Sequence, residues 1–243
     1  MSPYPPNVDD EIRVVGLNEY KEAARSLAEA FAVDDTCRYF LDTPDRAHWT
    51  EQQKWELHVA ILEYITYSHI LKGLVTTVGP NYGAVALWMP PNTTNDDWLT
   101  LLRSGLWRLQ YKLSAEGKKR FFQEFLPLLH DTKHAALGAR EDDAWYLVYI
   151  GTRPQSRGRG YARKLIEQIT AQADKEGRPC YLESSNAINP KIYRKMGFQE
   201  VRRIHLQRAE RNICLDIMIR EPGAGPQPEP EKPEQLEISV MAT

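Results

Sequence analysis

The sequence predicts a mixed α/β fold of the α+β kind, in which helices flank a central sheet. Two apolar runs, at residues 74–78 and 84–89, are separated by the turn sequence Pro80-Asn-Tyr-Gly83, which is typical of an antiparallel hairpin. A third run, at residues 145–150, is β-branched and aromatic, and a glycine turn and an amphipathic segment follow it. Strands and helices are therefore interleaved along the chain.

The region before the hairpin predicts one strand and two helices. Residues 11–16 read as the first strand. Asn18 is a suitable N-cap for a helix with apolar side chains at helical spacing, and this helix is expected to break near Asp34 and Asp35. Residues 50–70 carry aliphatic and aromatic side chains at helical intervals, which predicts a long buried helix.

Residues 96–137 predict a series of helical segments, broken around Ser114 and Pro127. We expect the large apolar side chains of this stretch to lie mostly in the core, with some of them lining a ligand cavity. They are Trp98, Leu102, Leu106 and Trp107.

The second half of the chain predicts a strand at residues 145–150 and a helix at about 161–176 that Gly177 ends. Another strand follows at 179–184, and residues 199–206 and 212–219 form a closing pair. From Glu221 the chain is rich in Pro and Glu and too polar to build a core, so it should be extended or disordered. We therefore expect one domain over residues 1–220 and a tail over 221–243.

Composition is that of a soluble globular protein. The 243 residues are 42% hydrophobic and 26% charged, and the formal net charge of -2 gives no overall attraction to nucleic acid. No apolar stretch is long enough for a membrane span, and the N-terminus lacks the features of a signal peptide. Three scattered cysteines favour reduced thiols. We expect a cytoplasmic or nuclear protein without nucleic-acid or membrane partners.

The turn between residues 153 and 161 has the features of an anion site. A helix that begins near Gly160 leaves its first N–H groups unpaired and carries a partial positive charge there. Gly158 and Gly160 allow a ligand to approach the main chain closely. The arginines around the turn suit phosphate oxygens, although a solvated basic helix start explains each of them equally well when taken singly.

Two motifs resemble signatures of the GNAT acetyltransferase superfamily. Arg157-x-x-Gly160-x-Ala162 is similar to its pyrophosphate-binding signature, and a second frame beginning at Gln155 fits less well. About thirty residues later, Asn186 stands seven residues before Tyr193, and Gly197-Phe198 follows, as in the second signature of the superfamily. Within the superfamily, the puromycin acetyltransferase type is loosely the most similar.

The resemblance implies a central mixed, mostly antiparallel, twisted sheet that is splayed between its fourth and fifth strands, with a helical insertion at about residues 95–137. It also implies acetyl-CoA as cosubstrate, with its amide-rich arm along the strand at 146–152 and the thioester near the N–H of Tyr149 or Ile150. The residues expected to bind acetyl-CoA are Tyr149, Ile150, Gly151, Thr152, Arg157, Gly158, Arg159, Gly160, Tyr161, Ala162, Asn186, Asn189 and Tyr193.

Tyr193 matches the tyrosine that lies beside the coenzyme A sulfur in this superfamily, and a phenol can protonate the departing thiolate. Its alternative role is aromatic packing on the sheet. Asn189, followed by Pro190, is expected to cap the helix that contains Tyr193.

Glu183 interrupts an apolar strand near the expected splay, so we consider it the candidate general base and a substrate contact. The alternatives are that Glu183 pairs with Arg163, Arg194 or a backbone group, or that a water chain replaces the base. Asp34 and Asp35 fall where this superfamily binds its acceptor and would attract a cationic amine, but surface aspartates at a helix end are the more frequent explanation of such a pair.

The sequence therefore predicts an acetyl-CoA-dependent N-acetyltransferase that acts on a primary amine of a small molecule by direct attack on the thioester. No metal is expected, because the six histidines show no ligand spacing. The alternatives are an acetyltransferase for protein N-termini or lysines and a catalytically weak module that binds coenzyme A. The sequence leaves the identity of the amine and the oligomeric state open.

Overall fold

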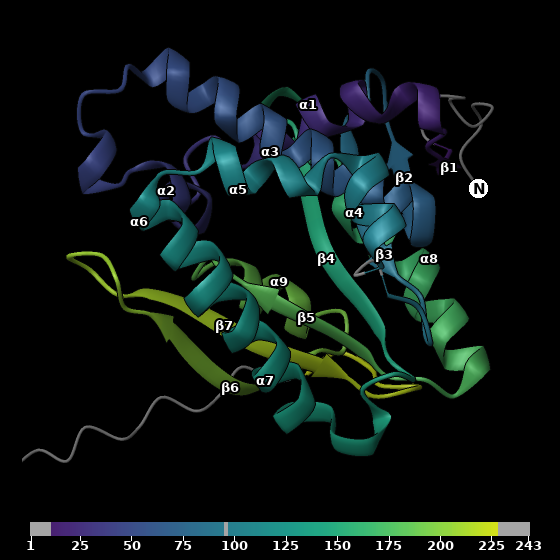
Figure 1. The fold of residues 1–243 in the computed structure, drawn as a ribbon. Helices are drawn as coiled ribbons and strands as arrows, with labels where there is room; N and C mark the ends of the chain where they lie inside the picture. The colour runs from purple at the N-terminus through teal and green to yellow at the C-terminus, as the bar shows by residue number, and fades with distance from the viewer. Residues whose placement is uncertain (1–10, 95–96, 228–243) are drawn as a thin grey trace, which may run out of the picture.

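A computed structural model describes residues 11–94 and 97–227 (Figure 1). Within this part of the chain, seven strands form one sheet in the order β1-β2-β3-β4-β5-β7-β6. Their bounds are Arg13–Val14 (β1), Leu74–Val78 (β2), Ala84–Met89 (β3), Trp145–Thr152 (β4), Cys180–Ser184 (β5), Gln199–Leu206 (β6) and Ile213–Arg220 (β7). The neighbours pair antiparallel except β4 and β5, which are parallel. The predicted mixed, mostly antiparallel sheet is confirmed.

The β4 and β5 strands part after a short stretch of pairing. Residues 145–147 of β4 pair with residues 180–182 of β5, whereas residues 149–152 of β4 pair with β3 alone. Glu183 and Ser184 pair with β7 alone. The sheet is therefore splayed between its fourth and fifth strands, and the splay leaves main-chain groups of β4 without a partner strand.

Helices cover both faces of the sheet (Figure 1). Their bounds are Tyr20–Ala30 (α1), Asp35–Leu41 (α2), Glu51–Lys72 (α3), Trp98–Ser104 (α4), Leu109–Lys112 (α5), Ala115–Lys118 (α6), Leu126–Leu137 (α7), Tyr161–Glu176 (α8) and Asn189–Arg194 (α9). A π-helical segment, Lys119–Phe125, joins α6 to α7.

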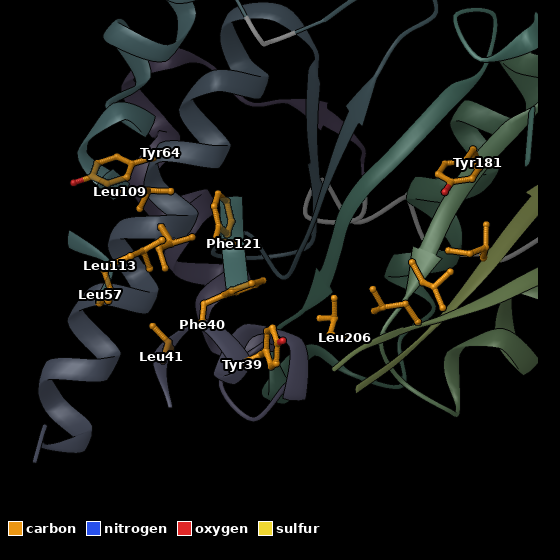
Figure 2. Packing of buried hydrophobic residues seen from close by; sticks show 14 of the residues in the cluster. Tyr39, Phe40, Leu41, Leu57, Tyr64, Leu109, Leu113, Phe121, Tyr181 and Leu206 are labelled. Carbon is orange, nitrogen blue, oxygen red and sulfur yellow. The ribbon is translucent and has the colours of Figure 1, made fainter. Parts of the chain in front are cut away.

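Three buried apolar clusters hold these layers together. The side chains of α8 and α9 pack on one face, where Leu165, Ile169 and Tyr193 meet β3, β4 and β5. On the opposite face α1 and α3 cover β2 and β3. Beside them, α2, α3 and residues 106–137 cover β5, β7 and β6, and Figure 2 shows Tyr39, Phe40 and Phe121 between these helices, with Tyr181 and Leu206 on the sheet.

Three local predictions need correction. The first strand is only two residues long, at Arg13–Val14. Asn18 is not an N-cap, because it lies inside the short 3-10 turn Leu17–Glu19. The N-cap of that turn is Gly16, whose amide donates to the carboxylate of Glu19 at 2.9 Å. Pro127 does not break the helical region: it occupies the first turn of α7, where its missing N–H costs little.

The helices of the 95–137 region expose more apolar surface than we expected. Trp98, Leu102 and Trp107 are exposed rather than buried, and only Leu106 among the four predicted core residues packs against the apolar cluster. Ser114, by contrast, marks a helix boundary as predicted, since its hydroxyl accepts from the Gly117 amide and caps α6.

The first residues after Arg220 lie against the domain. The amide of Gly223 donates to Asp174 Oδ1 at 2.7 Å, and the amide of Gln227 donates to the carbonyl of Arg194 at 2.8 Å. The Arg220 guanidinium bonds both Asp174 and the Ala224 carbonyl. Residues 221–227 are thus attached to α8 and α9, and the remainder of the predicted tail lies outside the described residues.

Candidate active site

A bulge in β4 turns its main chain toward the splay. The register with β3 shifts at Val148, which has no paired residue, since Leu147 and Tyr149 pair with the consecutive residues 88 and 87. Before the bulge, the Trp145 amide points toward β5 and donates to the Pro179 carbonyl; after it, the Arg153 amide donates to Gly83, on the β3 side. Because N–H groups alternate along a strand, those of Ile150 and Thr152 face the open edge.

The N-terminus of α8 presents a row of main-chain donors near the end of that edge. Within the described part of the chain, the N–H groups of residues 158–163 have no hydrogen-bond acceptor. Gly158 and Gly160 have φ of 79° and 75°, and a Cβ on either would meet nothing within 4 Å. The turn is open above both glycines, and the start of a 16-residue helix adds partial positive charge there. This geometry suits an anion.

The arginines near the turn divide into two groups. Arg153 forms an ion pair with Glu29 and Arg163 with Glu167, so their charges are already partly balanced. Arg157 is exposed and donates to the Ala30 carbonyl at 3.4 Å, and Arg159 is exposed beside it. Arg157 and Arg159, the two arginines inside the motif, are therefore available to bind an anion.

Two other predicted cofactor residues have a clear packing role. Tyr161 is buried, and a Cβ on Gly79 would lie 2.5 Å from its ring, so the ring fills the space beneath the hairpin turn. A Cβ on Gly151 would lie 2.7 Å from the Cβ of Ala30, because α1 crosses β4 at this point. Ala162 is partly buried at the start of α8.

Glu183 lies at the splay in a low-polarity environment. Its Oε2 accepts a hydrogen bond from the Tyr146 hydroxyl at 2.8 Å, whereas Oε1 is buried without a hydrogen-bond partner among the described residues. Burial raises the pKa of Glu183 to about 7, although the hydroxyls of Tyr146 and Tyr181 and the charge of Lys133 oppose the shift. A carboxylate with that pKa can exchange a proton near neutral pH.

Tyr149 lies within electrostatic range of both Glu183 and Asp34. Burial raises its pKa well above the ordinary value, and the neighbouring groups of Cys37, Asp34 and Glu183 add to the shift. Its ring packs edge to face on Phe31 at 5.3 Å. Tyr149, Asp34 and Glu183, which the sequence proposed separately, are therefore near one another in the structure.

The two predicted substrate aspartates differ. Asp34 caps α2 by accepting from the Cys37 amide at 3.0 Å, and its other oxygen accepts from the Ser185 hydroxyl at 2.6 Å. Asp35 is exposed in the first turn of α2, where its charge acts on Arg38. The structure brings Asp34 to the splay and leaves Asp35 at the surface.

The residues of the second motif lie just beyond β5. Asn186 is exposed and its Oδ1 accepts from the Ile188 amide at 2.9 Å. Asn189 does not cap α9 as we predicted: Ile188 is the N-cap residue and Asn189 is the first helical residue. Tyr193 is buried on the α8 side with its ring 5.8 Å from that of Phe198, and burial raises its pKa, so the phenol stays protonated at neutral pH.

Sequence reasoning missed four residues of this region: Tyr146, Tyr181, Ser185 and Lys133. Tyr146 and Tyr181 pair across the parallel strands, with ring centroids 5.3 Å apart, and Lys133 of α7 lies 5.4 Å from the Tyr146 ring. The alternation of strand residues places Tyr181 and Glu183 on one face, so Tyr181 could have been found from Glu183. Tyr146 and Lys133 are distant in sequence and carry no such signal.

The two buried cysteines are not activated thiols. Burial raises the pKa of Cys180 to about 12 and that of Cys37 well above its usual range, so neither thiol is prepared as a nucleophile. Within residues 11–94 and 97–227, no three His, Cys, Asp or Glu side chains are arranged to hold a metal ion.

Comparison with known proteins agrees with this geometry. Residues 129–200 match the model of an acetyltransferase (GNAT) domain. The chain is also 49% identical over 208 residues to an uncharacterized N-acetyltransferase of Schizosaccharomyces pombe, covering 86% of this chain and 82% of that protein. The chain belongs to the GNAT acetyltransferase superfamily.

Solved structures of this GNAT fold superpose on most of the chain. Arylalkylamine N-acetyltransferase 2 from Aedes aegypti is 16% identical, with a TM-score of 0.54, over 87% of this chain and 98% of the other. An agmatine N-acetyltransferase is 13% identical, with a TM-score of 0.53, over 87% of this chain and all of the other. These similarities concern the fold, and the homologue in S. pombe supports an N-acetyltransferase, an acyl-transferring enzyme.

Proposed function

We propose that the protein transfers an acetyl group from acetyl-CoA to a primary amine of a small, cationic molecule. The observation that carries the proposal is the open edge of β4, with the free N–H groups of Ile150 and Thr152, between the amides at the start of α8 and the carboxylate of Glu183. An extended ligand with an anionic end and a reactive end suits that arrangement.

The residues present fit the cosubstrate. The unpaired amides of residues 158–163, with Arg157 and Arg159 beside them, suit a pyrophosphate. The edge at Ile150 and Thr152 suits an amide-rich arm, because a strand edge offers donors and acceptors at regular spacing. When bound there, acetyl-CoA supplies a thioester whose acetyl group an amine can accept.

The side chains at the splay supply proton transfer and positioning. An alkyl ammonium must lose a proton before it can attack, and Glu183, with a pKa of about 7 and an uncommitted Oε1, can accept that proton. The Tyr146 hydroxyl holds the other oxygen in place. With a thioester bound at the edge of β4, the Ile150 N–H would polarise its carbonyl, and Tyr193 would donate a proton to the departing thiolate.

A small cationic acceptor is favoured by charge and by shape. Both oxygens of Asp34 are already bonded, so Glu183 is the carboxylate that remains to attract a cation. Helix α7 carries Lys133 over Tyr146 on this face, which leaves less room for a polypeptide than for a small amine. Two of the structural neighbours are named for small amines, agmatine and arylalkylamines.

Calorimetric titration with coenzyme A tests the anion site. In G160V, the β-branched side chain opposes a positive φ and fills the open space of the turn, so affinity should fall at least tenfold. G177V is the matched control, because Gly177 ends the same helix with a φ of 67° and an equally open Cβ position. Equal affinity in the two variants would exclude this turn as the coenzyme site.

The reaction itself is tested by a screen of small amines with detection of thiol release, followed by a pH profile on the best acceptor. The wild-type rate should fall as pH drops through about 7, because protonated Glu183 cannot accept a proton. E183Q should be slow and should lack this acidic limb. If the acidic limb persists in E183Q, another group is the base. If the enzyme acetylates peptides and none of the small amines, its acceptor is a protein.

A further inference from the structure

Helix α4 has its polar and apolar sides reversed. It packs on α3, and its buried residues are Thr100 and Ser104, which are 2% and 6% exposed. Trp98 is 73% exposed and Leu102 is 52% exposed. At 100° per residue, the outward direction of this helix centres on Leu102, the opposite of the usual arrangement in a globular protein. An apolar helix side that faces water is typical of a surface that binds something.

The apolar surface continues beyond α4. Gly105, with φ of 82°, turns the chain into α5, where Leu109 is buried and Tyr111 is 80% exposed. The rings of Trp107 and Tyr111 contact each other edge to face at 6.0 Å. We call the exposed apolar residues of this segment the insertion face; they are Trp98, Leu99, Leu101, Leu102, Trp107 and Tyr111.

The insertion face is also cationic. Arg103, Arg108 and Lys112 are exposed among its apolar residues, and residues 98–112 contain no aspartate or glutamate. The nearest described carboxylate in the sequence, Asp97, is held by Lys72 and by the cap of α4. Two copies meeting through this face would bring like charges together, which argues against a second copy as the occupant.

We propose that the insertion face binds the surface of an anionic lipid bilayer. Trp and Tyr favour the boundary between headgroups and acyl chains, leucines enter below them, and Arg and Lys contact anionic headgroups. Trp98 and Tyr111 are 73% and 80% exposed and so project from their helices into solvent, which suits insertion into a bilayer. The contact is peripheral, since none of the helices among the described residues could span a bilayer. It departs from our expectation of no membrane partner, which rested on the lack of a long apolar stretch in the sequence.

Sedimentation of the full chain with lipid vesicles tests this proposal. The protein should bind vesicles of phosphatidylcholine mixed with phosphatidylserine, bind phosphatidylcholine alone weakly, and dissociate as salt is raised. W98S/L102S should lose binding to the mixed vesicles, because it removes the centre of the apolar face. R103Q/K112Q should weaken binding about twenty-five-fold, since each cation near an anionic surface contributes roughly a factor of five.

A matched control is V14S/V201S, which removes two exposed apolar side chains from β1 and β6 and should bind as the wild type does. The proposal is wrong if the wild type does not bind mixed vesicles, or if W98S/L102S binds them equally well. It is also wrong if analytical ultracentrifugation shows a wild-type dimer that W98S/L102S converts to a monomer, because a second copy would then cover the face.

Discussion

The Ser185 hydroxyl donates a hydrogen bond of 2.6 Å to Asp34 Oδ2 and so ties the loop after β5 to the start of α2. The two residues are 151 positions apart in the sequence. Because β5 leaves β4 before this point, the bond connects two parts of the site that the sheet does not hold together. Asp34 is therefore a structural link across the site, besides any contact with substrate.

Loss of the Ser185 hydroxyl should lower the free energy of unfolding, and loss of the Asp34 carboxylate should lower it further. S185A loses one part-buried hydrogen bond and should unfold about 1 kcal/mol more easily in urea. D34A also loses the cap of α2, for a total of about 2 kcal/mol. D35A is the control and should unfold like the wild type, since Asp35 is exposed. If D34A and D35A have the same midpoint, the bond contributes nothing in solution.

The Tyr193 hydroxyl should matter for turnover more than for binding. Y193F keeps the buried ring and its contact with Phe198 but cannot protonate a thiolate, so kcat should fall by roughly a hundredfold while coenzyme A affinity stays within about twofold. Y67F removes the hydroxyl of a tyrosine on α3 and provides the control. Wild-type turnover in Y193F would show that another group supplies the proton.

The strands could be predicted because each carries its own signal. The hairpin at β2 and β3 combines apolar runs with turn residues, and the run at 145–150 ends in a glycine turn, so local sequence and fold agree. The two GNAT motifs could be recognised for a related reason: each requires fixed residues at short spacing. The surroundings of Glu183 could not be predicted in this way, because Tyr146 and Lys133 reach it through the register of parallel strands and the docking of α7.

Helix α4 shows a different limit of prediction from sequence. Helical spacing tells which residues share a side of a helix, but not which side faces the protein. We placed Trp98 and Leu102 inside because apolar residues usually are, whereas Thr100 and Ser104 occupy that position. In most globular helices the apolar side faces the protein. Because α4 has the reverse arrangement, we assign its exposed apolar side to binding.

Glu183 should make the folded protein less stable as pH rises, which is the opposite of the effect of a carboxylate in a salt bridge. Burial raises its pKa from 4.5 to about 7, so the folded state binds the proton more tightly than the unfolded state does. Its stabilising contribution is complete below pH 4.5 and is lost as pH rises through 7, for a total of roughly 3 kcal/mol. E183Q removes this dependence, so its unfolding free energy relative to the wild type should increase between these pH values.

E210Q is the control for that experiment, because Glu210 is exposed, and its unfolding free energy should follow the wild type at every pH. Urea titrations at a series of pH values provide the measurement. A constant difference between E183Q and the wild type would mean that Glu183 has an ordinary pKa, and the proposal that it is the base would lose its electrostatic support.

Arg120 should be the residue on which the packing of the 106–137 region depends most. Its buried guanidinium donates to the carbonyls of Tyr39, Asp42 and Arg208 at 2.7, 3.2 and 2.8 Å and forms an ion pair with Glu116. R120M would leave buried carbonyls without donors, so it should lower the free energy of unfolding by about 3 kcal/mol or more. K119M changes the exposed neighbouring residue and should have little effect. If urea denaturation gives both variants the same midpoint, α2 and the turn after β6 are held to this region by apolar packing alone.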